Sequence, residues 1–433
     1  MLPTRPLRIA LISEHASPLA PAGGVDAGGQ NVYVAHVAEA LARRGHRVDV
    51  LTRRDAAGLP DVVALRRHAR CVHVPAGPAC FVPKERLLEH MPAFMRAAGR
   101  WMHAHGPYDV IHANFFMSGW VGLGLQRLFA VPLVVTFHAL GLVRRAHQGT
   151  SDTFPLERIE IERRLASEAS RIVAECPQDR DDLVGLYAAA PGRIDIVPCG
   201  VDRREFAPGD RRIARRWLGL DEREFVVLQL GRLVPRKGVE QVIRAVARLP
   251  PRLRARLLVV GGESPEPDEA RTPEIARLRT IARECGIAER VLFTGRRDRA
   301  ELARYYIASD VFVTTPLYEP FGITPLEAMA CGVPVIGSAV GGIQHSVADG
   351  VTGFLVGAGD VDALAARLAQ LHADPRLGRA LGRAGIERVQ RLFTWEHVAD
   401  GLVRTYRRAL RQPSAVGSVR GMPAAMQLSL QAP

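Results

Sequence analysis

The amino-acid sequence predicts an α/β protein made of two doubly wound, Rossmann-like domains. The chain has 433 residues, more than one hydrophobic core usually holds. Short apolar runs alternate with helical patterns along nearly its whole length. The runs are continuously apolar, as expected for parallel strands that helices cover on both faces. Two such series in one chain indicate two domains of similar size.

The first series predicts an N-terminal domain over residues 1–205. Its clearest helix is "NVYVAHVAEALARRG", where apolar side chains recur every three to four residues and a glycine ends the pattern. The strands are expected at residues 7–13, 47–52, 108–114, 133–138, 171–176 and 193–200.

The second series predicts a C-terminal domain over residues 206–393. The polar, turn-rich stretch 201–212 is the expected linker between the domains. The five strands are expected at residues 225–232, 255–262, 290–296, 311–316 and 333–338. Residues 412–433 show no charge pattern and no strong period, so we expect a disordered tail.

Composition narrows the class of protein. Hydrophobic residues at 47% and charged residues at 24% are ordinary for a globular chain, and the longest apolar runs are too short to span a membrane. Six scattered cysteines without a CxxC pair, and a start unlike a secretory signal, predict reduced thiols and a cytoplasmic location. The net charge of +13 favours phosphorylated metabolites or an anionic membrane surface. Because the cations are dispersed and no nucleic-acid-binding motif is present, no nucleic-acid partner is expected.

A glycine-bearing loop, "EHASPLAPAGGVDAGGQNVYV", follows the first strand and opens into a helix. Gly28 and Gly29 would let the backbone approach a phosphate at the helix N-terminus. The spacing is not GxGxxG, which disfavours a dinucleotide-dependent dehydrogenase. A connection that needs glycine only for its turns explains the loop equally well.

Lysine is rare in this chain. Lys+Arg totals 58, and only Lys84 and Lys237 are lysines. In "LGRLVPRKG", Arg232 ends a strand and Lys237 lies at the start of the next helix, which suits a diphosphate clamp. The stretch is not a Walker A loop, and a solvated basic loop is the ordinary explanation for one lysine. The scarcity of lysine weakens that explanation here.

Two glutamates stand close together in "YEPFGITPLEAMACGVPVI". Thr324 and Pro325 predict a helix start with Glu327 in a capping box, so Glu327 has a structural explanation. Glu319 lies before that helix and has none. A carboxylate there can accept hydrogen bonds from sugar hydroxyls.

His138 ends a predicted strand and is placed to meet a substrate, although most of the fourteen histidines must be incidental. Two DxD strings, residues 179–181 and 360–362, stand at predicted helix starts, where aspartate caps a helix. We therefore expect no metal site at either string.

Five segments together resemble the retaining family 4 glycosyltransferases of GT-B fold. They are "DAGGQNVYV", "TFHALG", "GRLVPRKG", "YEPFGITPLEAMACGVPVI" and "FTWEHVA", and the resemblance runs over residues 7 to 411. Within that family the start of the chain is similar to the sucrose-phosphate synthases and the inositol-phosphate N-acetylglucosaminyltransferases. The resemblance implies that the helix at 394–411 crosses back to pack on the first domain.

The resemblance also implies roles for the donor side. Arg232 and Lys237 would hold the donor diphosphate, with no metal ion as cofactor. The other donor contacts would be Glu327 on the ribose, Glu319 and the backbone of Phe321, Gly322 and Ile323 on the sugar, Arg296 beside the base, Gly28 and Gly29 on the phosphate, and His138 on the transferred sugar.

For the acceptor, the resemblance to the inositol-phosphate branch implies contacts from Asn31, Lys84 and Arg158. That branch has hydroxyl side chains where this chain has Phe115 and Ala139, which argues against inositol phosphate itself. The stretch "ALGLVRRAHQG" is closer to the sucrose-phosphate branch, whose acceptor is a sugar phosphate. A surface position at a helix start explains Lys84 equally well.

The expected function is hexose transfer from a nucleoside diphosphate sugar, with UDP-glucose or UDP-N-acetylglucosamine foremost, to a small acceptor, either a sugar or a sugar phosphate. One alternative is a peripheral-membrane transferase acting on a lipid or polysaccharide precursor, because residues 85–106 form a basic amphipathic stretch. A nucleotide-sugar epimerase or hydrolase of the same fold, or a non-catalytic nucleotide-sugar sensor, also stays open. The sequence makes no prediction of oligomeric state.

Overall fold

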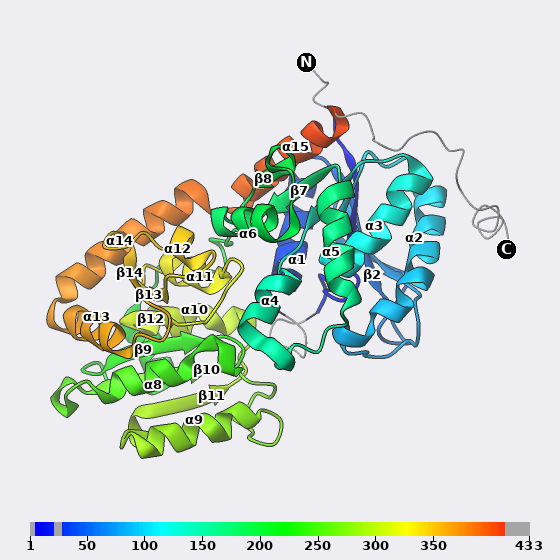
Figure 1. Cartoon of the computed structure of the whole chain (residues 1–433). Helices are drawn as coiled ribbons and strands as arrows, with labels where there is room; N and C mark the ends of the chain where they lie inside the picture. Colours follow the sequence, from blue (N-terminus) through cyan, green and yellow to red (C-terminus); the bar gives the residue numbers. More distant parts are fainter. Residues whose placement is uncertain (1–4, 21–27, 412–433) are drawn as a thin grey trace. The chain divides into compact units, whose positions relative to one another are not determined.

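The structure, a computed structural model, describes residues 5–20 and 28–411 (Figure 1). These residues form two compact units: residues 5–20, 28–197 and 398–411 form the first, and residues 198–397 form the second. The domain boundary was expected after residue 205, whereas the chain leaves the first unit after Val197 and returns to it at Val398. The predicted tail, 412–433, lies outside the described residues.

The first unit is built on an eight-stranded sheet in the order β3-β4-β2-β1-β5-β6-β7-β8. Neighbouring strands pair in parallel, except for the antiparallel pair β3 and β4. The strands are β1 (Arg8–Ile12), β2 (Arg47–Arg53), β3 (Val62–Arg66), β4 (Ala69–Val74), β5 (Val110–Asn114), β6 (Leu133–Thr136), β7 (Arg171–Ala174) and β8 (Ile194–Ile196). The six predicted strands are present, but β3 and β4 were missed. Strand β3 is an edge strand whose side chains are all at least partly exposed, whereas β4 is largely buried.

Helices of the first unit pack against this sheet. They are α1 (Gly29–Arg43), α2 (Met91–His105), α3 (Phe116–Phe129), α4 (Gly141–Gln148), α5 (Glu157–Glu168) and α6 (Pro177–Tyr187). Helix α2 contains most of the basic amphipathic stretch, residues 85–106, that motivated the membrane-surface alternative. Its Met91, Phe94 and Met102 are buried in the core of this unit, so its apolar face is already used. Among the described residues, every helix is too short or too polar to cross a bilayer.

Helix α15 (Trp395–Arg411) begins in the second unit, and its residues from Val398 onward belong to the first. Tyr406 is fully buried, and its hydroxyl lies 2.8 Å from Nδ1 of His112 on β5. The helix expected at residues 394–411 is therefore present and completes the core of the first unit.

The second unit has a six-stranded parallel sheet in the order β11-β10-β9-β12-β13-β14. Its strands are β9 (Phe225–Leu230), β10 (Ala255–Val260), β11 (Val291–Gly295), β12 (Val311–Thr314), β13 (Val335–Ser338) and β14 (Gly353–Val356). Its helices are α7 (Arg211–Leu218), α8 (Val239–Ala247), α9 (Pro273–Glu284), α10 (Arg299–Ala308), α11 (Ile323–Ala330), α12 (Ile343–Ser346), α13 (Val361–Ala373) and α14 (Pro375–Leu392). The prediction omitted only the short edge strand β14.

The prediction of a linker at residues 201–212 is wrong. Phe206 is fully buried, and the Glu205 carboxylate lies 2.6 Å from Nε of Arg299 on α10. The turn-forming composition is typical of an exposed connection, but the segment packs into the second unit. Both sheets are thus doubly wound, and in such sheets ligands bind beyond the carboxyl ends of the strands.

Candidate active site

Two segments of the second unit that are far apart in sequence meet at Lys237 and Glu319. Lys237 ends a short 3-10 turn (η5, Pro235–Lys237) between β9 and α8, and Glu319 lies in the loop between β12 and α11. The Lys237 ammonium donates to Oε2 of Glu319 in a close ion pair. The two residues singled out on separate motifs are therefore direct neighbours at the carboxyl edge of this sheet.

Positive charges outnumber negative charges around this ion pair. Burial lowers the pKa of Lys237 below its ordinary value, although the Glu319 carboxylate opposes that shift. Burial alone would raise the pKa of Glu319, but Lys237, Arg236 and Arg232 outweigh it and hold that pKa below its usual range. Three cations thus act electrostatically on one carboxylate, and the excess positive charge suits an anionic ligand.

Arg236 was missed as a candidate site residue. Its guanidinium lies over the Tyr318 ring, 5.0 Å from the centroid, and its buried Nη1 has no hydrogen-bond partner among the described residues. A buried N–H without an acceptor is costly, which suggests that a ligand oxygen could satisfy it. The sequence feature that could have identified Arg236 is its position next to Lys237 in the same turn.

Gly238 fixes the turn that carries Lys237. Its φ of +69° is in the left-handed region, and a Cβ at this position would lie 2.0 Å from the carbonyl oxygen of Thr315. The Thr315 hydroxyl also donates to the Gly238 carbonyl oxygen at 2.8 Å. The backbones of the Lys237 turn and of the segment after β12 can approach this closely only with glycine here.

Replacing Gly238 with alanine should therefore displace Lys237. We expect Gly238→Ala to lower the free energy of unfolding of the second unit by about 2 kcal/mol or more, from strain and collision together. Gly359→Ala is the matched control, because Gly359 has a φ of +80° and open space around its Cβ position. Chemical denaturation followed by circular dichroism would compare them, and equal losses in the two variants would contradict the close-approach explanation.

The capping box predicted at Thr324 is wrong. Helix α11 begins at Ile323 with Gly322 as its N-cap, since Gly322 takes a φ of +84°. Glu327 is 2% exposed and bonds Nη1 of Arg299 at 2.8 Å and the Tyr306 hydroxyl at 2.9 Å. Its carboxylate therefore ties α11 to α10, and the ribose contact stays a prediction.

The loop at 319–323 is shaped by two further glycines. The Gly342 amide donates to the carbonyl oxygen of Glu319 at 3.1 Å, and a Cβ on Gly341 would lie 1.8 Å from that oxygen. The Phe321 side chain is buried, so Phe321 can offer a ligand only its backbone.

Arg296, predicted to lie beside the base, follows β11. Its backbone amide donates to the Ser264 carbonyl oxygen at 2.7 Å.

In the first unit, His138 lies between the ends of three neighbouring strands. Its Nδ1 is 3.0 Å from the Glu175 carboxylate after β7, and its Nε2 is 2.9 Å from Oδ1 of Asn114 on β5. The Tyr33 ring packs edge-on at 4.8 Å. Both ring nitrogens are thus held, and the histidine has a φ of +58°. Asn114 and Glu175 were missed, although each stands at the end of a predicted strand.

A second histidine, His15, follows β1 in the same unit. Its Nδ1 lies 2.7 Å from the buried carboxylate of Glu14, which accepts a hydrogen bond from the Ser118 hydroxyl. The His15 ring packs edge-on against Phe115 at 5.0 Å. Phe115 thus lies in an aromatic environment and offers no hydroxyl group.

The glycine-bearing loop is described from Gly28 onward. Gly28 is the N-cap of α1, Gly29 is its first residue, and the Gly28 amide donates to Oδ1 of Asn31 at 2.9 Å. Asn31 also donates to the Ser17 carbonyl at 3.0 Å, so this side chain orders the loop. Lys84 begins a short 3-10 turn, and its Nζ lies 3.5 Å from the Glu85 carboxylate.

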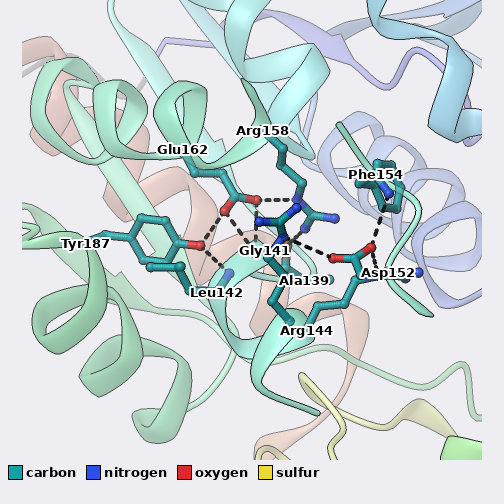
Figure 2. Close-up of polar contacts among 10 residues, drawn as sticks. Ala139, Gly141, Leu142, Arg144, Asp152, Phe154, Arg158, Glu162 and Tyr187 are labelled. Carbon is teal, nitrogen blue, oxygen red and sulfur yellow. Dashed lines mark hydrogen bonds and ion pairs between the residues drawn. The ribbon is translucent and has the colours of Figure 1, made fainter. Parts of the chain in front are cut away.

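Arg158 lies on α5 with a side chain that is 1% exposed, and Figure 2 shows its polar contacts. Its Nε pairs with Glu162 at 2.7 Å and its Nη2 donates to the Ala139 carbonyl at 2.6 Å. Three phenylalanine rings surround the guanidinium with centroids at 4.7–5.0 Å, namely Phe115, Phe116 and Phe154. Its Nη1 is buried without a hydrogen-bond partner among the described residues. Among the residues that the structure describes, no hydrogen bond joins Arg158 to Asn31, another of the predicted acceptor contacts.

The two DxD strings are helix starts, as predicted. Asp360 is the N-cap of α13 and accepts from the Ala363 amide at 2.9 Å. Asp179 lies in the first turn of α6 and accepts from the Glu175 amide at 2.9 Å. Burial, with the Glu175 carboxylate nearby, raises the pKa of Asp179 to about 8.

This raised pKa predicts a pH-dependent stability of the first unit. Between the unfolded pKa of 3.8 and the folded value of about 8, the folded chain keeps a proton that the unfolded chain loses. Stability should therefore fall as pH rises through this window and level off above it. We expect Asp179→Asn to flatten the profile, whereas Asp181→Asn, at an exposed position, should leave it unchanged. Urea denaturation across the window would test this, and a slope that persists in Asp179→Asn would contradict it.

Comparison with known families covers both halves of the chain. Residues 27–205 match the family described as Glycosyltransferase Family 4, and residues 210–388 match Glycosyl transferases group 1. The D-inositol 3-phosphate glycosyltransferase of Actinosynnema mirum is 40% identical over 412 residues, covering 93% of this chain and 97% of its own. The enzyme of the same name from Mycobacterium marinum is 40% identical over 409 residues, covering 93% and 86%.

Solved structures agree with the fold. Sucrose-phosphate synthase from Thermosynechococcus elongatus superposes with a TM-score of 0.85 at 38% identity, covering 93% of this chain and 98% of that one. HepE of Anabaena, solved with UDP and glucose, gives a TM-score of 0.74 at 21% identity, covering 93% and 99%. The second likeness concerns the fold alone.

Proposed function

Because the chain belongs to the family 4 glycosyltransferases of GT-B fold, we propose that it transfers a hexose from a nucleoside diphosphate sugar to a small phosphorylated acceptor, with retention of configuration. UDP-glucose and UDP-N-acetylglucosamine are the first donors to test. In this reaction the bond from sugar C1 to the diphosphate breaks and a bond from C1 to an acceptor hydroxyl oxygen forms. The hydroxyl proton leaves with the diphosphate.

The observation that carries this proposal is the cluster of Lys237, Arg232 and Arg236 around Glu319. A departing diphosphate gains negative charge, and positive groups already in place stabilise it without reorganisation. Glu319 is then free to accept hydrogen bonds from sugar hydroxyls once the phosphate attracts Lys237.

We propose that these cations, rather than a metal ion, neutralise the diphosphate. The adjoining start of α8 supports this, because helix N-termini favour anions. Turnover should be unchanged by an excess of EDTA, measured as release of the nucleoside diphosphate. A loss that Mg²⁺ or Mn²⁺ restores would contradict this part of the proposal.

The names of similar proteins favour a phosphorylated acceptor. Arg158 is 1% exposed and paired with Glu162, so the acceptor contact implied for it stays a prediction. The relatives at 40% identity are named for inositol 3-phosphate, and the structure at 38% identity for sucrose phosphate. Phe115 and Ala139 offer no hydroxyl side chain, so a sugar phosphate is favoured over inositol phosphate. None of the six cysteines, all within the described residues, forms a disulfide, which suits the cytoplasm, where such metabolites occur.

A substrate screen tests the proposal directly. Purified protein would be incubated with UDP-, ADP- and GDP-sugars, with and without sugar phosphates, and the anomeric configuration of the product read by NMR. A new glycosidic product with the donor configuration is expected. Conversion of the donor without any acceptor would instead indicate an epimerase or a hydrolase.

Lys84 should affect only the phosphorylated acceptor if it contacts the phosphate. We expect Lys84→Ala to raise KM for that acceptor by roughly tenfold, because a charge-assisted hydrogen bond is lost. KM for the nucleotide sugar should stay the same, and Arg86→Ala in the same turn serves as the control. Equal KM values in wild type and Lys84→Ala would remove Lys84 from the acceptor site.

A further inference from the structure

Helix α7 in the second unit buries an arginine and exposes two large apolar side chains. Arg215 is only 2% exposed, whereas Ile213 is 58% exposed and Trp217 is 46% exposed. A surface helix of a globular protein normally buries its apolar stripe and exposes its charges. The outward face of α7 therefore calls for an explanation other than packing.

The rotation of α7 is fixed by Arg215. Its Nε donates to the Ala308 carbonyl at 3.0 Å and its Nη2 pairs with Asp310 at 2.7 Å. Its Nη1 also donates, at 2.9–3.3 Å, to three carbonyl oxygens of the turn that follows, those of Asp221, Glu222 and Glu224. With this side chain locked inward, residues 213 and 217, one turn apart, must point outward.

Trp217 is held in place on that outward face. Its ring meets Tyr305 of α10 edge-on at 6.1 Å, and the Arg304 guanidinium lies 4.6 Å from the ring centroid. One side of the indole is therefore packed, while nearly half of the residue stays exposed. A fixed, half-exposed indole beside a cation is the arrangement that tryptophan adopts at membrane–water interfaces.

Cations surround the two apolar side chains. Arg212 and Arg216 share the exposed face of α7, and Arg379 of α14 is near enough to act on Arg211. No carboxylate lies within ion-pair distance of Arg216, Arg304 or Arg379 anywhere in residues 5–20 and 28–411. The nearby acids are otherwise engaged: Asp310 pairs with Arg211 and Arg215, and Glu222 lies 3.8 Å from Arg212.

We propose that the α7 patch, defined as Arg212, Ile213, Arg216, Trp217 and Arg304, binds the surface of an anionic lipid bilayer. Ile213 and Trp217 enter the headgroup region, and the arginines meet lipid phosphates. A second copy of the chain fits less well, because a two-fold contact through this face would bring the same arginines together. The proposal is independent of the sugar and acceptor used, and it moves the membrane contact from residues 85–106 to α7.

Vesicle flotation of the full chain tests the proposal. Wild type should float with vesicles of phosphatidylcholine and phosphatidylglycerol at low salt, should bind less at high salt, and should not float with phosphatidylcholine alone. The double variant Arg212→Gln/Arg216→Gln should weaken binding by roughly fivefold for each arginine. The double variant Ile213→Ala/Trp217→Ala should weaken it by about tenfold.

The matched control is Val351→Ala/Arg252→Gln, which removes an equally exposed apolar side chain and an exposed arginine elsewhere on the same unit. It should float like wild type, and all variants should keep the wild-type rate with a water-soluble acceptor. Flotation of Ile213→Ala/Trp217→Ala at the wild-type level would overturn the proposal, as would no binding to anionic vesicles. The proposal would also be overturned if light scattering showed that the wild type is a dimer, that Ile213→Ala/Trp217→Ala is a monomer, and that neither protein binds vesicles.

Discussion

Lys237→Met lowers kcat for sugar transfer by about 10²–10³-fold while the chain stays folded; this is the largest catalytic effect that we expect. Methionine keeps the length of the side chain and removes its charge. The positive charge is needed most when the diphosphate departs, so kcat should fall further than KM for the donor rises. The fold should survive because Lys237 is 20% exposed and Glu319 keeps Arg232 and Arg236 as neighbouring cations.

Two companions make the measurement specific. Arg244→Met removes an exposed cation on α8, where Arg244 pairs with Glu240, and should leave turnover near the wild-type value. Lys237→Arg keeps the charge but replaces a compact ammonium with a planar fork, so partial activity is expected. Steady-state release of the nucleoside diphosphate would be followed for each variant. Near-normal turnover in Lys237→Met would contradict the role given to this lysine.

Glu162→Ala should cause the largest loss of stability, about 3–5 kcal/mol in the free energy of unfolding of the first unit. The Glu162 carboxylate is fully buried and faces Arg158, whose side chain is 1% exposed. It also accepts from the Gly141 amide at 2.9 Å and from the Tyr187 hydroxyl (Figure 2). Without it, a buried guanidinium keeps its positive charge with no carboxylate beside it.

The control lies on the same helix. Glu160 is 69% exposed, so Glu160→Ala should change stability by no more than about 0.5 kcal/mol. The double variant Arg158→Met/Glu162→Leu should recover part of the loss, because no unpaired buried charge remains. Urea denaturation followed by circular dichroism would rank the variants. A loss in Glu162→Ala no larger than in Glu160→Ala would refute the buried ion pair.

Much of the architecture was predictable because parallel strands are apolar throughout and stand out from amphipathic helices. Strands β3, β4 and β14 escaped prediction although they are largely apolar; β14 has only four residues, and β3 and β4 form an antiparallel pair. Lys237 and Glu319 were each singled out from the sequence, but their ion pair was not predicted. The start of α11 was predicted wrongly, because Gly322, with its positive φ, is the N-cap of the helix in place of Thr324.

The buried ion pair of Arg158 and Glu162 shows why other features could not be predicted from the sequence. In "ERIEIERR" the two residues look like one more surface pair at a spacing of four. They are buried because α5 packs closely on α3, where a Cβ at Gly119 would lie 2.5 Å from Leu165. Helix α7 was hidden for a similar reason: nothing local to "RRIARRWL" says that Arg215, and not Trp217, points inward.

The return of the chain to the first unit at Val398 has a consequence for synthesis on the ribosome. The second unit is an insertion into the first, and the final helix supplies Tyr406 to His112 on β5. The N-terminal sheet must therefore wait, with that part of its core open, until the whole inserted unit has been translated. A nascent chain released before residue 398 would carry a complete second unit and an unfinished first one.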